Sequence, residues 1–188
     1  MSKLNKAITL GVCAGMLLGV AGTTGVINNS QVATVEAAQT TNGIKVSQKS
    51  ALNKFNQKFA NKQVSEINLE KNGNKYVYEI SGFDSSNEYE MEINAQTGKV
   101  ISSSKDQLDT DDSYSTTALD TSKTISRNEA SKIAEKVAKK GASRSWDLKQ
   151  EDQNLAVWEV KVGKGNNTKE VTINAQTKKI LNVVNDYD

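Results

Sequence analysis

The sequence predicts an α+β fold of two tandem repeats, each with one helix packed on a small antiparallel sheet of three to four strands. The first observation is a duplication: residues 90–101, EMEINAQTGKVI, return at 170–181 as EVTINAQTKKIL, with seven identities. The second is that a helical apolar period, followed by alternating strands, precedes each copy. The third is an acidic stretch rich in Ser and Thr between the copies. Units of about sixty residues bury little surface alone, so we expect the repeats to pack against each other.

The first 37 residues have the pattern of an export signal. Lys3 and Lys6 precede an uncharged stretch with an apolar segment, and Val35 and Ala37 meet the small-residue rule for cleavage after Ala37. The alternative is an uncleaved N-terminal anchor, because residues 7–27 are just long enough to span a bilayer. We therefore expect an extracellular or cell-surface protein that contacts a membrane only through this segment.

Composition excludes several classes of function. Cys13 is the only cysteine and lies in the export signal, so the mature chain forms no disulfide, which suits an exported protein of a monoderm bacterium. Removal of residues 1–37 takes away two lysines and Glu36, which leaves 22 basic and 21 acidic residues. Neither nucleic acid nor an anionic membrane surface is implied as a partner.

The chain contains no histidine, which excludes Ser-His-Asp and Cys-His nucleophiles and His-based zinc sites. A Ser-Lys dyad is the enzymatic alternative, but the serines lie mainly in helix caps and the linker. We expect no catalytic residue, no metal site and no cofactor.

Repeat 1 is expected at residues 46–104, after a polar lead at 38–45. Ser47 is positioned to cap a helix from about Gln48 to Asn61, whose apolar stripe needs a sheet to cover it. An Asn-Gly turn at 72–73 joins the first two expected strands. The inward residues of the three strands are Ile67 and Leu69, then Tyr76, Tyr78 and Ile80, then Tyr89, Met91 and Ile93.

The opposite face of the third strand carries Glu88, Glu90 and Glu92, and Glu79 stands on the neighbouring strand. These four glutamates are the candidate partner-contact residues, for a basic peptide or a lysine-bearing cell-wall partner. The alternative is an ordinary solvated sheet face, since alternating polar positions are what such a face needs. The aromatic residues at 76, 78, 146 and 158 follow strand spacing and are expected in the core rather than at a binding site.

Residues 105–124 are expected to form a linker, either free or held as a strap by Tyr114 and Leu119. Its aspartates offer an alternative, a Ca²⁺ site. They lack the glycine and distal glutamate of an EF-hand, so a solvated linker is preferred. The aspartates concerned are Asp109, Asp111, Asp112 and Asp120.

Repeat 2 is expected at 125–188. Ser126 and Glu129 form a capping box at the start of its helix, and Gly141 fits the C-cap. Four strands follow in the same order as in repeat 1. Lys178 stands where repeat 1 has Gly98, so we expect the second hairpin tip to accept strain or to form a different turn.

This unit of helix, small sheet and closing hairpin resembles the PepSY domain. The match is carried by INAQTGKV at 93–100 and INAQTKKI at 173–180, with Tyr-Glu-Ile at 78–80 and Trp-Glu-Val at 158–160 as central strands. The pattern covers about two thirds of the chain, and Lys178 departs from it. The motif is structural rather than an active site, and comprises Asn94, Ala95, Thr97, Gly98, Asn174, Ala175 and Thr177.

The resemblance implies a function, because PepSY units occur in propeptides of secreted metallopeptidases and in exported bacterial proteins. The family is proposed to inhibit or regulate peptidases and has no catalytic residues to carry over. We therefore expect a free-standing, non-catalytic binding module for a protein or peptide, such as a secreted peptidase, that uses its acidic face or its exposed sheet edge. The alternative is a structural or adhesive spacer of the cell envelope.

Overall fold

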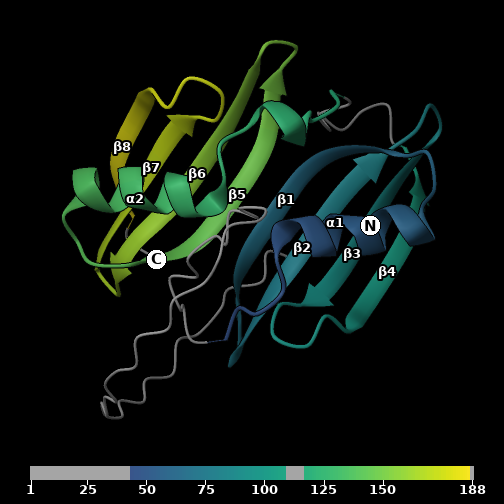
Figure 1. Cartoon of the computed structure of the whole chain (residues 1–188), viewed down its shortest axis with the longest axis horizontal. Coiled ribbons are helices and arrows are strands. Elements are labelled where there is room, and N and C mark those ends of the chain that lie inside the picture. The colour runs from purple at the N-terminus through teal and green to yellow at the C-terminus, as the bar shows by residue number, and fades with distance from the viewer. Residues whose placement is uncertain (1–42, 109–116, 187–188) are drawn as a thin grey trace, which may run out of the picture. The chain divides into compact units, whose positions relative to one another are not determined.

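The computed structural model describes residues 43–108 and 117–186. The described residues belong to one compact unit (Figure 1). Its helices are α1 (Gln48–Lys58) and α2 (Arg127–Ala138), with a short 3₁₀ turn η1 (Thr121–Lys123) before α2. The strands of repeat 1 are β1 (Gln63–Asn72), β2 (Lys75–Phe83), β3 (Asn87–Asn94) and β4 (Val100–Gln107). Those of repeat 2 are β5 (Ser143–Asp152), β6 (Leu155–Lys164), β7 (Asn167–Asn174) and β8 (Ile180–Asp186).

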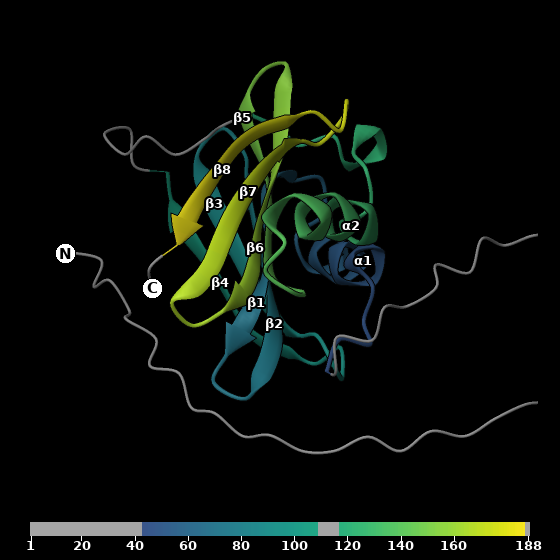
Figure 2. The ribbon, with the colours of Figure 1, turned by 90° about the vertical axis from the view of Figure 1, so that its left-hand side faces the viewer.

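All eight strands belong to one antiparallel sheet, in the order β4-β3-β2-β1-β5-β6-β7-β8. The predicted α+β class and tandem units are confirmed, but the sequence did not indicate that the repeats share a sheet. They join through β1 and β5, which lie side by side (Figure 1) and pair from Glu66 with Lys149 to Leu69 with Trp146. Both helices lie on the same face of this sheet (Figure 2). We call the opposite face the open face.

A single hydrophobic core runs under both helices. Tyr78 and Trp158 are each 1% exposed, and they are the equivalent residues of β2 and β6. The Tyr78 hydroxyl donates to the carbonyl of Val46 at 3.0 Å, and Trp158 Nε1 donates to the carbonyl of Ile125 at 3.0 Å. Each acceptor lies immediately before a helix N-cap, so both polar tips help to fix where a helix begins. The expected core role of these aromatic residues is confirmed.

The hairpin motif connects three elements in each repeat. Ala95 is fully buried; its N–H donates to the carbonyl of Tyr76 at 2.9 Å, and its carbonyl accepts from the N–H of Val46 at 2.8 Å. Ala175 repeats this arrangement with the carbonyl of Ala156 and the N–H of Ile125. The motif alanine therefore joins the hairpin to the central strand and to the residues that precede the helix. Because this alanine is fully buried in both repeats, a larger side chain would not fit.

The two hairpin tips are nearly the same, so the first of the two expected outcomes is confirmed: Lys178 accepts strain, and the second tip does not form a different turn. Gly98 has φ of 73° and Lys178 has φ of 67°. In both tips the residue at this position donates to the carbonyl of the motif asparagine, at 2.8 Å and 2.9 Å. The Asn94 and Asn174 side chains each accept two backbone N–H groups. This network holds Lys178 in the left-handed conformation, where a Cβ is strained.

Some predicted boundaries differ from the structure. Helix α1 ends at Lys58 rather than Asn61, which itself has φ of 61°. The C-cap of α2 is Lys139 with φ of 52°, not Gly141, because the chain turns left-handed immediately after Ala138. Strand β4 continues to Gln107, since its backbone pairs with β3 although its side chains have no apolar pattern. Beyond it, Leu119 is 7% exposed and its N–H donates to the carbonyl of Val64; Tyr114 lies outside the described residues.

Lys178→Gly is expected to raise the free energy of unfolding by about 0.5 to 1 kcal/mol, because glycine relieves the left-handed strain. The change also removes the exposed ion pair between Lys178 and Glu129, which contributes little. Urea unfolding measures the effect, with Gly98→Ala as the reverse test, expected to destabilise by about 1 kcal/mol. A loss of stability in Lys178→Gly would show that the ion pair outweighs the strain.

Candidate acidic binding face

The open face of the sheet is strongly acidic. Side chains alternate along each strand, so the residues between the buried core positions point to this face. We define the acidic row as Glu92, Glu79, Asn68, Asp147 and Glu159, which are successive lateral partners on β3, β2, β1, β5 and β6. Further carboxylates flank the row on the same face: Glu66, Glu70, Glu88, Glu90, Glu151 and Glu170.

The structure places all four predicted contact residues on the open face and brings three of them together. Carboxylate oxygens of Glu79, Glu90 and Glu92 lie within 4.8 Å of one another. Glu92 also accepts a hydrogen bond from Ser102 Oγ of β4 at 2.8 Å. Glu88 lies two residues before Glu90 on β3, opposite Phe83, and is not part of this cluster. Oxygen ligands at this spacing are the type that a hard cation or an ammonium group prefers.

The surroundings of Glu79 disfavour its ionised form. Burial is the largest cause, and together with repulsion from Glu90, Glu92, Glu66 and Glu70 it raises the pKa of Glu79 from 4.5 to about 7. Glu79 is partly buried because its strand, β2, lies between β1 and β3 in the sheet. Glu79 therefore holds a proton over much of the neutral pH range unless a cation approaches.

Sequence reasoning missed the part of the face that crosses the joint. Asp147 pairs with Asn68 at the centre of the β1–β5 contact, and its pKa is raised by burial and by Glu66. One side-chain oxygen of Asp147 and the amide oxygen of Asn68 are buried without a hydrogen-bond partner in the part of the chain that the structure describes. The alternation around Trp146 and Leu148 predicts that Asp147 points outward, but no pattern indicated which strand lies beside it.

The two halves of the open face differ in charge. In repeat 2, Lys149 Nζ lies 2.9 Å from Glu159, 3.5 Å from Glu151 and 3.8 Å from Asp147. Lys161 lies 3.1 Å from Asp186. The equivalent positions of repeat 1 are Glu70 and Ser81, which supply no cation. Repeat 2 therefore pairs several of its carboxylates with lysines, whereas the positions equivalent to Lys149 and Lys161 add no positive charge to repeat 1.

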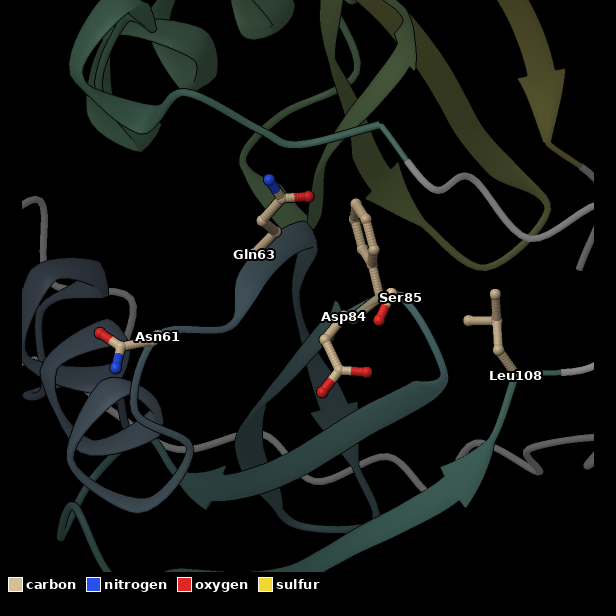
Figure 3. Close-up of a pocket in the computed structure, with 6 residues that line it drawn as sticks. Asn61, Gln63, Asp84, Ser85 and Leu108 are labelled. Carbon is tan, nitrogen blue, oxygen red and sulfur yellow. The ribbon is translucent and has the colours of Figure 1, made fainter.

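A second feature is a hollow of about 560 Å³ at the end of β2, lined in part by Gln63, Phe83 and Leu108 (Figure 3). Its charged group, Asp84, is engaged in structural bonds with Lys62 Nζ at 2.6 Å and the Tyr89 hydroxyl at 2.7 Å. These contacts hold the pKa of Asp84 well below its usual range. The one charged side chain among the lining residues is therefore already engaged in structural contacts.

The linker aspartates Asp109, Asp111 and Asp112 lie outside the described residues. Asp120 caps η1 by accepting from the N–H of Ser122 at 3.1 Å, and pairs with Lys123 at 2.9 Å. It is thus engaged in local structure. Across residues 43–108 and 117–186, no helix has the length and apolar character that a membrane crossing needs. The export signal or anchor predicted at 1–37 lies outside this range.

Comparison with known proteins identifies the fold family. The model of the peptidase propeptide and YPEB domain, PepSY, matches residues 45–103 and 124–184. The chain belongs to the PepSY family. A crystal structure from Clostridium difficile 630, of a protein described as a putative lipoprotein, is 27% identical with a TM-score of 0.68. That match covers 76% of this chain and 95% of the other. No curated protein matches. The resemblance inferred from the hairpin motif is thus confirmed.

The stability of this PepSY protein is expected to fall as pH rises from about 4.5 to 7 through the contribution of Glu79. The folded state holds the proton of Glu79 more tightly than the unfolded state does. The destabilising effect of ionised Glu79 is therefore absent below the unfolded-state pKa of 4.5 and fully present above the folded-state pKa of about 7. Glu79→Gln should therefore stabilise the protein at pH 8 by about 1 to 2 kcal/mol relative to wild type and have little effect at pH 4.5.

Urea unfolding across this pH range measures the effect. Glu88→Gln is the matched control, because it removes the same charge from the same face of the sheet, on β3 and outside the cluster. Equal effects of the two substitutions would contradict a special environment at Glu79.

Proposed function

We propose that this protein is an exported, non-catalytic binding module that docks a basic polypeptide segment on the repeat 1 half of its open face. Charge complementarity is the observation that carries the proposal. Four glutamates of β1 and β3 surround Glu79 on that face, and the nearest lysine on the joint, Lys149, already contacts three carboxylates of repeat 2. A cationic side chain would relieve repulsion that the fold does not relieve itself.

Strand geometry supports an extended partner. Residues two apart on a strand are separated by about 6.6 Å, so Glu88, Glu90 and Glu92 form an evenly spaced column along β3. An extended peptide has the same repeat between alternate side chains. Its basic residues at every second position would match the column, whereas clustered basic residues would not.

Family membership supports the type of partner. The description of the matched family refers to peptidase propeptides, in which such a domain is covalently attached to a peptidase. We propose that this chain binds an extracellular peptidase, or peptides near the cell surface, in trans. Regulation of proteolysis follows if the docked segment belongs to the peptidase. The cell-surface location rests on the predicted export signal and on the description of the clostridial relative.

The test uses an acetylated and amidated octapeptide of alternating Lys and Ser and the mature chain 38–188 at low salt. A triple variant with Glu79→Gln, Glu90→Gln and Glu92→Gln is expected to bind the peptide with a dissociation constant at least tenfold higher. Each ion pair between a peptide lysine and one of these glutamates contributes roughly 0.5 to 1 kcal/mol to binding. The matched control replaces Glu151, Glu159 and Glu170 of repeat 2 and should have a smaller effect. Isothermal titration calorimetry measures both.

A peptide in which Glu replaces Lys should not bind. Absence of binding by the Lys-Ser peptide at millimolar concentration would contradict the proposal and favour the structural spacer. Equal losses in the two triple variants would place the contact elsewhere on the sheet.

A further inference from the structure

We propose that the acidic cluster of repeat 1 exchanges a bound proton for the cationic group of its partner, so that docking releases a proton and strengthens as pH rises. This inference rests on the proposed function and concerns the regulation of the same face. The affinity of the open face for a basic segment would therefore fall as the medium outside the cell becomes more acidic.

The sheet forces the carboxylates together. Glu79 has Glu92 as its lateral partner on β3 and Asn68 as its partner on β1, and Glu90 lies diagonally beside it. Oxygens of Glu79, Glu90 and Glu92 are within 4.8 Å of one another. Three like charges at this separation repel strongly in a partly desolvated site, and one shared proton removes much of that repulsion. Strand register fixes the backbone positions of these three residues next to one another.

Among the described residues, the groups that face Glu79 from the neighbouring strands are mainly carboxylates. The neighbouring strand β1 presents Glu66 and Glu70, and β4 presents the Ser102 hydroxyl, which already donates to Glu92. Across the joint, β5 presents Asp147 together with Lys149, which is held by the repeat 2 carboxylates, and β6 presents Glu159. On β2 itself, the nearest outward lysine is Lys75, four residues away or about 13 Å along the strand.

Asn68 adds an acceptor rather than a cation. Its buried amide oxygen has no hydrogen-bond partner among the described residues and lies on the lateral partner of Glu79. A protonated Glu79 or an arriving ammonium group is the kind of donor this environment lacks. A proton on Glu79 and a cationic group of the partner would each reduce the repulsion and supply a hydrogen-bond donor. We therefore expect the cationic group to displace the proton.

The size of the coupling follows from the pKa of Glu79, which is about 7 in the free protein. An adjacent ammonium restores the ionised form. About one proton should be released per peptide at pH 6 and clearly fewer at pH 8.5, and affinity should be about tenfold higher at pH 8 than at pH 6.

The experiment is calorimetric titration of the mature chain with the blocked Lys-Ser octapeptide in two buffers of different ionisation enthalpy, at pH 6, 7 and 8.5. Blocked termini leave only lysines on the peptide, which do not titrate in this range. The buffer dependence of the heat gives the number of protons released. Glu79→Gln should still bind but lose at least half of the proton release and most of the pH dependence. Glu159→Gln, at the equivalent position of repeat 2, should keep both, because Lys149 already pairs with Glu159.

The two proposals fail in different ways. Absence of peptide binding at every pH would overturn the proposed function. Binding with the same affinity at pH 6 and 8.5 and no buffer-dependent heat would overturn only the proton exchange. Proton release that persists fully in Glu79→Gln would also overturn it, since the proton would then come from another group.

Discussion

The antiparallel contact between β1 and β5 is the interaction on which the rest of the molecule depends. Asn68 and Asp147, equivalent residues of the two repeats, pair at its centre, and Ile67 with Leu148 and Leu69 with Trp146 flank them on the core side. The two repeats thus pair around Asn68 and Asp147 in the way that two identical subunits pair around a two-fold axis in a homodimer. It covers two strand edges that would otherwise be exposed, and it merges two small cores into one. It also places the charged outward residues of both repeats on one continuous surface.

The helix-free face is the consequence that matters for function. Because both helices cover the same side, the charged outward residues of the strands lie on the other side of the eight-stranded sheet, and those of β3 in repeat 1 are glutamates. Duplication explains how the halves diverged. Lys149 and Lys161 balance repeat 2, whereas Glu70 and Ser81 at the same positions leave repeat 1 acidic. One copy thus has a surface whose charges compensate each other, while the other carries the proposed binding surface.

Much of the fold could be predicted from residue patterns, because capping by Ser47 and Ser126, the alternation of Met91 with Ile93, and the repeated hairpin are all local signals. Local sequence patterns do not predict which strands pair when those strands are far apart in the chain. Nothing in the residues of β1 indicates that β5 will be its neighbour, so the role of Asp147 could not be foreseen. Lys178 shows the opposite case: its local preference is overridden by hydrogen bonds to Asn174 that only the folded hairpin provides.

The central claim is that the joined sheet holds Glu79 among like charges at a site where it cannot ionise normally. The most direct measurement is a titration of the Glu79 side-chain carboxyl carbon by NMR in the unliganded mature chain. A midpoint near pH 7 is expected for Glu79. A midpoint near the ordinary value of 4.5 would show that the face is well solvated and uncoupled, and would contradict both the electrostatic strain and the proton exchange built on it.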